Sequence, residues 1–256
     1  MTSLVDFTID GAVALVRLNR PPVNALSAEL SSDLKEAFEA AADPKIRAIV
    51  VTGQPHFAAG ADIKGFQAVY EAGGEQKLAR TLAEAVEVLD HLEKPTIAAI
   101  HGYALGGGLE LSLGADFRFL AVDALVGQPE IKLGLIPGAG GTQRLARLVG
   151  FQKAKDIVLT GRQVGAEEAL SIGLADRVYP SDRLLEESMR AATEMATWPT
   201  RAVAAAKRAL AEGWGRPLPE GMAAEAQNFD ASFWTEDARE GVAAFLEKRP
   251  ATFHGR

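Results

Sequence analysis

The chain of 256 residues contains no cysteine, so it forms neither disulfides nor thiolate metal sites. A reducing compartment fits that composition. The chain has no apolar run long enough to span a bilayer. Its opening, MTSLVDFTID, lacks the basic start and apolar stretch of a secretory signal. The net charge is −7, which argues against binding to nucleic acid. We therefore expect a cytoplasmic protein with neither membrane nor nucleic-acid partners.

Several common catalytic signatures are also absent. No Walker lysine motif is present, and neither Ser112 nor Ser171 stands in a G-x-S-x-G elbow. The segment GAGGTQ, residues 138–143, has Gln143 where a dinucleotide fingerprint needs its last glycine. The four histidines show no H-E-x-x-H spacing, and we interpret His101 as a packing residue. We therefore expect no metal site and no dinucleotide cofactor.

The first half of the chain alternates predicted strands and helices. VDFTIDGAVALVRL predicts a hairpin that turns at Asp10-Gly11. The strands predicted in IRAIVVTG, PTIAAIHG and DFRFLAV are mainly apolar rather than alternating, which is typical of a largely parallel sheet covered on both faces. Between them we expect a helix capped by Ser27, a loop over QPHFAAGADIKGF and a helix over residues 75–92.

The second half predicts mainly helices. From Thr142 onward, apart from the short segment ADRVYP, the pattern favours helix. Glycine, proline and tryptophan separate four predicted helices, near residues 181–196, 201–213, 219–234 and 237–248. The alanine-rich helices of the last sixty or so residues either cover the core or pack against another subunit.

The segment HGYALGGGLELSLGAD, residues 101–116, places three glycines before a charged residue in an otherwise apolar stretch. A helix is expected to begin near Gly107, where the first backbone N–H groups have no partner inside the helix. Glycine lets a ligand approach those groups closely. Such a helix start can stabilise a developing negative charge, as an oxyanion hole does. Glu110 lies in the first turn of this helix, next to the expected ligand.

A second glutamate, Glu130, stands in the similarly apolar and glycine-rich segment ALVGQPEIKLGLIPGAGG. If Glu110 and Glu130 lie close together, one of them should have a raised pKa and act as an acid. The residues alone leave a structural role equally open, because an early helical glutamate also favours the helix dipole and glycines also permit tight packing.

Four segments together resemble the crotonase, or enoyl-CoA hydratase, family. They are HFAAGADIKGF, KPTIAAIHGYALGGGLELSLGAD, VGQPEIKLGLIPGAGGTQRLARLVG and GRQVGAEEALSIGLADRVYP, in the family's order and over most of the chain. The resemblance implies an α/β fold, a crotonase-type spiral of repeated β-β-α units, over residues 1–195. It implies a C-terminal helical trimerisation region over residues 196–256, with homotrimers that often pair into hexamers.

The same resemblance implies an acyl-CoA thioester substrate and no cofactor, because CoA is part of the substrate. The backbone N–H groups of Ala61 and Gly107 would hold the thioester oxygen, and Gly138 would help to place the water. Lys248 would either reach the CoA phosphates of a neighbouring subunit or stay exposed without a partner. The substrate-binding residues implied in this way are Ala25, Ala61, Asp62, Ile63, Lys64, Gly107 and Gly138.

Glutamates at both positions favour a hydratase within this family. The expected reaction is the reversible syn hydration of a trans-2-enoyl-CoA to a 3-hydroxyacyl-CoA, with Glu110 deprotonating water and Glu130 protonating the α-carbon. A Δ3,Δ2-enoyl-CoA isomerase, another acyl-CoA enzyme of this fold and a non-catalytic acyl-CoA-binding protein stay open. Fatty-acid, amino-acid and aromatic-acid degradation are equally open as pathways. The expected acyl-pocket walls are Phe66, Ala68, Val69, Tyr70, Leu109 and Leu133.

Overall fold

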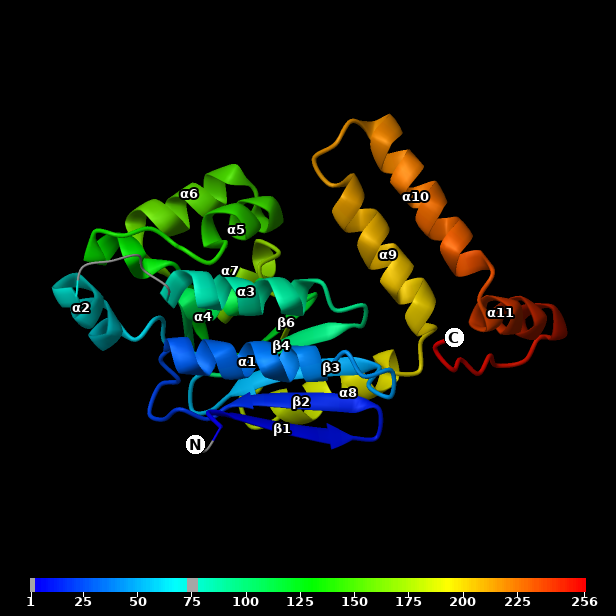
Figure 1. The fold of residues 1–256 in the computed structure, drawn as a ribbon, viewed down its shortest axis with the longest axis horizontal. Helices are drawn as coiled ribbons and strands as arrows, with labels where there is room; N and C mark the ends of the chain where they lie inside the picture. The colour runs from blue at the N-terminus through cyan, green and yellow to red at the C-terminus, as the bar shows by residue number, and fades with distance from the viewer. Residues whose placement is uncertain (1–2, 73–77) are drawn as a thin grey trace.

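A computed structural model, which describes residues 3–72 and 78–256, is built around a six-stranded sheet (Figure 1). The strand order is β1-β2-β3-β4-β6-β9, with β1 antiparallel to β2 and every other neighbouring pair parallel. The predicted hairpin is confirmed, and Gly11 at its turn has a φ of +58°. The strands are β1 (Val5–Asp10), β2 (Val13–Leu18), β3 (Ala48–Gly53), β4 (Thr96–Ile100), β6 (Phe117–Ala121) and β9 (Arg177–Tyr179).

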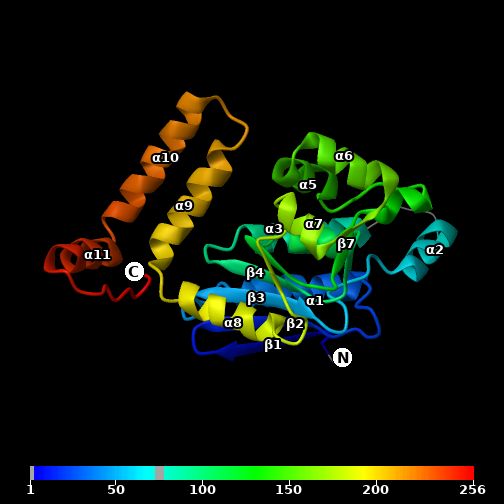
Figure 2. The same ribbon diagram turned by 180° about the vertical axis from the view of Figure 1, so that it is seen from behind.

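Helices cover both faces of this sheet. Every residue of β3 and β4 is buried, as their continuous apolar sequences predict. Helices α1 (Ala28–Ala40) and α3 (Leu78–Asp90) lie on one face, and α8 (Leu184–Met195) lies on the other, as Figures 1 and 2 show from opposite sides. Ser27 caps α1 as predicted, because its side chain accepts the N–H of Leu30 at 3.2 Å.

A second, three-stranded sheet was not predicted from the sequence. It joins β5 (Tyr103–Leu105), β7 (Leu125–Gly127) and β8 (Gln163–Gly165) in that order. The prediction of a loop throughout QPHFAAGADIKGF is wrong at its end, because α2 (Ile63–Ala72) begins inside it. The remaining elements of the body are α4 (Gly107–Ser112), the 3-10 helix η1 (Pro129–Leu133), α5 (Gly141–Val149), α6 (Phe151–Thr160) and α7 (Ala166–Ser171).

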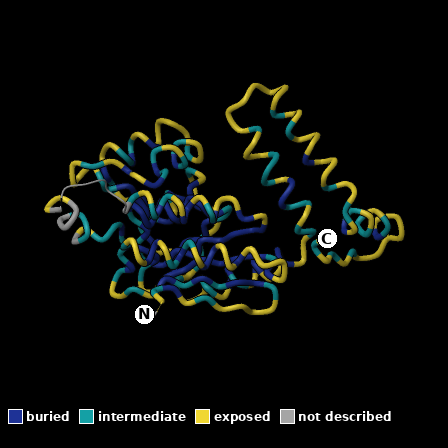
Figure 3. The backbone as a smooth tube through the Cα atoms, in the orientation of Figure 1, coloured by how far each residue is buried: buried dark blue, intermediate teal, exposed yellow. Residues whose placement is uncertain are grey.

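The last three helices extend away from this body. Helices α9 (Thr200–Gly213) and α10 (Leu218–Phe233) form an antiparallel pair, followed by α11 (Glu236–Glu247) (Figures 1 and 2). Figure 3 shows that much of this pair is exposed or only partly buried. Large exposed apolar side chains occur in α9, α10 and α11 and directly after α9 and α10, namely Leu210, Trp214, Leu218, Met222, Phe229, Phe233, Trp234, Phe245 and Leu246. The division into regions 1–195 and 196–256 stays a prediction.

The C-terminal tail returns to the start of α9. Arg47 donates hydrogen bonds to the carbonyl oxygens of Trp198 and Phe253, at 2.6 and 2.8 Å, and to the hydroxyl of Thr200 at 3.0 Å. One side chain of the body therefore fixes both ends of the helical region. None of the described helices is both long enough and apolar enough to cross a membrane.

Candidate functional site

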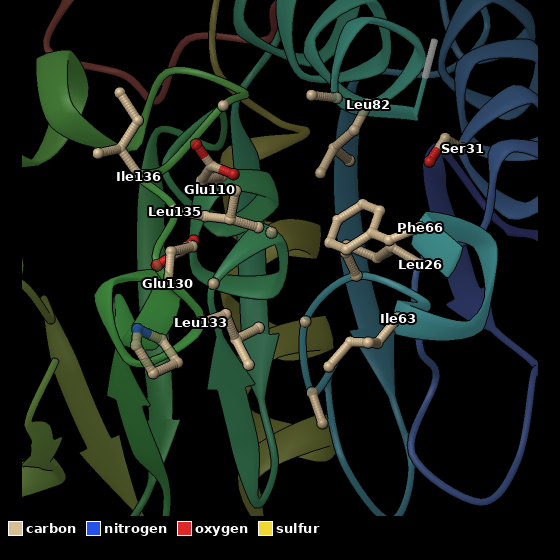
Figure 4. Close-up of a pocket in the computed structure, with 18 residues that line it drawn as sticks. Leu26, Ser31, Ile63, Phe66, Leu82, Glu110, Glu130, Leu133, Leu135 and Ile136 are labelled. Atoms are coloured by element: carbon tan, nitrogen blue, oxygen red, sulfur yellow. The ribbon is translucent and has the colours of Figure 1, made fainter. Parts of the chain in front are cut away.

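Residues from several distant parts of the sequence line one mainly apolar pocket of about 200 Å³. Six of the predicted site residues meet there, and Figure 4 shows Glu110 and Glu130 on one side of the pocket with Phe66 and Leu26 opposite. Those six residues are Ala61, Ile63, Gly107, Glu110, Glu130 and Gly138. The two segments that carry the glutamates therefore form one site.

Glu110 is held by the backbone at the start of α5. Its side chain is buried, with 3% of the residue's surface exposed. One carboxylate oxygen, Oε1, accepts the N–H groups of Ala139 and Gly141 at 2.7 and 2.8 Å. Burial raises the pKa of Glu110, while these hydrogen bonds, the backbone of Gly138 and the positive charge of Arg144 oppose that rise. The hydrogen bonds favour the ionised carboxylate.

Glu130 has fewer groups that favour its charge. It is the second residue of η1, which begins at Pro129 directly after the buried Gln128. With its amide nitrogen turned toward Glu130, Gln128 donates to the two carboxylate oxygens at 2.8 and 3.1 Å. Burial, and next the nearby charge of Glu110, raise the pKa of Glu130 to about 7. Near neutral pH the pocket therefore offers one carboxyl group that readily carries a proton.

The N–H of Ala61 points away from Leu26, the residue with which Ala61 pairs. Leu26 and Ala61 form an isolated parallel bridge, in which the N–H of Leu26 donates to Gly60 at 2.8 Å and the N–H of Asp62 donates to Leu26 at 2.9 Å. Because peptide groups alternate along an extended chain, the N–H of Ala61 points to the other side. It has no acceptor among the described residues.

Gly107 occupies the first position of α4, after Gly106 with a φ of +53°. The N–H of Gly106 donates to Gly127 at 2.9 Å, whereas the N–H of Gly107 has no acceptor in the described part of the chain. A Cβ added at Gly107 would lie 2.8 Å from Leu82 Cδ2 and 3.1 Å from Leu26 Cδ1. Two unpaired backbone donors thus belong to the same pocket as the two glutamates.

The other predicted contacts are distributed around this centre. Arg20 forms an ion pair with Asp62 at 2.5 Å and donates to the carbonyl oxygen of Ala25 at 2.7 Å, so it links both segments. The side chain of Lys64 lies outside the described residues. Lys248 ends α11 and is exposed. Among the described residues no group of three or more histidine, aspartate or glutamate side chains is placed to bind a metal.

Sequence reasoning found only part of the apolar wall. Phe66 and Leu133 line the pocket as predicted, whereas Leu109 is buried in the core and Tyr70 is exposed. The side chains of Ala68 and Val69 lie outside the described residues. Four wall residues that were not predicted are Leu26, Leu82, Leu135 and Ile136. Ala139 and Gly141 were also missed, although GAGGTQ before a helix was a signal for backbone donors.

Comparisons with known proteins identify the family of this chain. The model of the family described as Enoyl-CoA hydratase/isomerase matches residues 8–256. A probable enoyl-CoA hydratase of Rhizobium meliloti (strain 1021) is 45% identical over 96% of this chain and 96% of its own. The 2,3-dehydroadipyl-CoA hydratase of Escherichia coli (strain K12) is 43% identical over 95% of this chain and 96% of its own.

A solved structure extends the likeness to the fold. The enoyl-CoA hydratase of Bacillus anthracis has a TM-score of 0.91 and 36% identity, covering 99% of this chain and 100% of that chain. This chain belongs to the enoyl-CoA hydratase/isomerase family. The predicted family, the α/β class and the crotonase fold are thereby confirmed.

Proposed function

We propose that the protein catalyses the reversible syn hydration of a trans-2-enoyl-CoA to a 3-hydroxyacyl-CoA. One observation carries this proposal: Glu110 and Glu130 line one pocket beside the unpaired N–H groups of Ala61 and Gly107. Hydrogen bonds favour the ionised form of Glu110, whereas the pKa of Glu130 is raised to about 7. The hydratase names of the relatives support the same hydro-lyase class.

In the proposed reaction the thioester oxygen accepts the N–H groups of Ala61 and Gly107. Ionised Glu110 takes a proton from water as the oxygen of that water bonds to the β-carbon. The carbon–carbon double bond opens, and electron density moves through the α-carbon toward the thioester oxygen. Protonated Glu130 then donates its proton to the α-carbon. Glu110 has gained the proton that Glu130 has lost, so one proton must return to Glu130, directly or through solvent, before the next turnover.

The two N–H groups bind the enolate-like oxygen more strongly than the neutral carbonyl, because negative charge accumulates there in the transition state. A single donor of this kind typically contributes about 3 kcal/mol. Adding water leaves the total oxidation level of the carbon skeleton unchanged, so the proposed reaction requires no redox cofactor. We also propose an acyl-CoA substrate and a homotrimer or hexamer formed through α9–α11. A cytoplasmic location stays a prediction.

The direct test follows the loss of enoyl-thioester absorbance when purified protein is mixed with crotonyl-CoA. We expect rapid loss with the parent protein and a decrease of about 100- to 10,000-fold in kcat for Glu110→Gln or Glu130→Gln. Both variants should still bind butyryl-CoA, the saturated analogue, because the backbone donors are unchanged. Parent-like hydration by either variant would show that the assigned role is wrong.

The same experiment separates the alternative functions. An isomerase would move the double bond of a 3-enoyl-CoA without adding water. A binding protein would retain butyryl-CoA yet leave enoyl-CoA esters of every length unchanged.

A further inference from the structure

We propose that Arg144, anchored by Asp90, is a positioning residue that holds the backbone donors of residues 139–141 against Glu110 and so keeps Glu110 ready to act as the base. This inference rests on the proposed hydratase function. Arg144 does not line the substrate pocket, so it would act through the loop and not on the substrate itself.

The arginine bridges two helices. It lies in the first turn of α5, where its own N–H donates to Gly140 at 2.8 Å. Its Nε and Nη2 donate to one oxygen of Asp90, Oδ2, at 3.3 and 2.9 Å. Asp90 is the last residue of α3, which covers the central sheet. The start of α5 is thereby tied to a helix of the core.

The guanidinium lies directly over the loop that binds Glu110. Gly140 has a φ of +105°, and a Cβ added there would clash with Nη1 of Arg144. Gly140 is the residue between the two donors Ala139 and Gly141. Glycine at this position therefore satisfies the left-handed backbone and leaves space for the arginine. Displacement of Arg144 would leave Gly140 free to change conformation. The conformation of Gly140 directs the N–H groups of Ala139 and Gly141 at Oε1 of Glu110.

Charged groups from several elements surround Arg144 and Glu110. Arg144 and Asp90 line a second cavity of about 550 Å³. Its other basic residues and histidine are His91 directly after α3, Arg118 of β6, which pairs with Asp176 at 3.4 Å, Arg147 of α5 and two basic residues of α9. The two basic residues of α9 each have an acidic partner: Lys207 pairs with Asp116 at 2.8 Å, and Arg208 pairs with Glu93. On the substrate side, Glu130 is the charged neighbour of Glu110.

Arg144 is the basic residue whose charge opposes the rise in the pKa of Glu110. Its loss should therefore make Glu110 harder to ionise. The base is active only when ionised, so the acid limb of the kcat/KM profile should move to higher pH.

The experiment compares four variants with the parent protein in crotonyl-CoA hydration from pH 5 to 10. Arg144→Gln removes the positive charge, and Arg144→Lys retains the charge but lacks the planar guanidinium group. Asp90→Ala removes the carboxylate that accepts the hydrogen bonds of Arg144. Arg147→Gln is the matched control, because Arg147 is one turn along α5 and contacts Gln143. We expect Arg144→Gln to lower kcat about tenfold to a hundredfold and to move the acid limb to higher pH.

The remaining variants separate charge from geometry. Arg144→Lys should restore the acid limb toward the parent position while recovering kcat only in part. Asp90→Ala should lower kcat with a smaller displacement of the limb, and Arg147→Gln should match the parent. The dissociation constant of butyryl-CoA should stay constant throughout, because Ala61 and Gly107 are unchanged.

Amide hydrogen exchange gives a readout that does not need turnover. The peptide covering residues 137–143 should exchange faster in Arg144→Gln and in Asp90→Ala than in the parent or in Arg147→Gln. Parent-like exchange together with a parent-like acid limb in Arg144→Gln would overturn this inference. A parent protein that hydrates no enoyl-CoA would instead overturn the proposed function, while the exchange rates would still decide whether Arg144 holds the loop.

Discussion

At the scale of single residues, Glu110 and Glu130 owe their difference to the backbone around them. Two N–H groups converge on Glu110 Oε1, whereas Glu130 faces the amide of Gln128 and the charge of Glu110. Hydrogen bonds to a carboxylate favour ionisation, and burial beside another negative charge opposes it. The same type of side chain can therefore serve as the base at one position and as the acid at the other.

This difference predicts a fall in activity at alkaline pH. The pKa of Glu130 is raised to about 7, and the proposed acid works only when protonated. The kcat/KM for crotonyl-CoA should therefore decline as pH rises through about 7, approaching a tenfold loss per pH unit. Initial rates at low substrate concentration from pH 5 to 10 would measure it. A profile that stays flat up to pH 9 would contradict the assignment of Glu130 as the acid.

At the scale of elements, helix α4 packs so closely against the backbone of Ala58 that only glycine fits at residue 108. A Cβ added at Gly108 would clash with the carbonyl oxygen of Ala58, which is backbone. Ala58 in turn forms an isolated parallel bridge with Ala104. The position of Gly107 therefore depends on the absence of a side chain at the residue after it.

We expect Gly108→Ala to lower the free energy of unfolding by about 1–3 kcal/mol, because the helix must shift away from Ala58. Gly165→Ala is the control, since an added Cβ there meets nothing within 4 Å and its φ is −78°. That substitution should change stability by less than about 0.5 kcal/mol. Urea unfolding curves of the three proteins would measure both effects, and equal midpoints would contradict this account of α4.

The elements that the sequence predicted are those with long patterns. The apolar strand β3 and the Ser27-capped helix α1 were predicted because local sequence determines them. Strands β5, β7 and β8 have three residues each, too few to show a period, and their pairing partners define them. Their short lengths explain why the second sheet was missed.

In the candidate site, too, the sequence predicts residues that belong to local motifs and misses contacts between residues distant in sequence. Motifs predicted Glu110, Glu130, Ala61 and Gly107, and the structure brings all four to one pocket. The hydrogen bonds that Ala139 and Gly141 donate to Glu110 join residues about thirty positions apart, so no local pattern contains them. The pairing of Arg20 with Asp62, which lie 42 positions apart, was missed for the same reason.

At the scale of the whole molecule, the helices after residue 199 expose a large apolar surface. Met222 and Phe229 of α10 are 60% and 61% exposed, and they line a groove between α9 and α10. A surface of this kind favours association, because burying one such side chain contributes about 1.5–3 kcal/mol. This surface supports the proposed homotrimer or hexamer.

Association through this surface predicts that charges will disrupt it. Met222→Glu and Phe229→Glu combined should reduce the molar mass measured by light scattering to that of a monomer, about 27.1 kDa. Ile9→Glu is the control, because Ile9 is an exposed apolar residue of the edge strand β1. It should retain the parent mass. A parent protein that is already monomeric would refute assembly through α9–α11.

The two kinds of group in the proposed site differ in how easily mutation removes them. The thioester donors are main-chain amides, and only a change to proline at residue 61 or 107 would delete one. The acid and the base are side chains, and one nucleotide change in a glutamate codon already gives aspartate, glutamine, glycine or alanine. If the proposed roles hold, evolution can therefore replace the proton-transfer groups one codon at a time, while each intermediate protein keeps both backbone donors for the thioester.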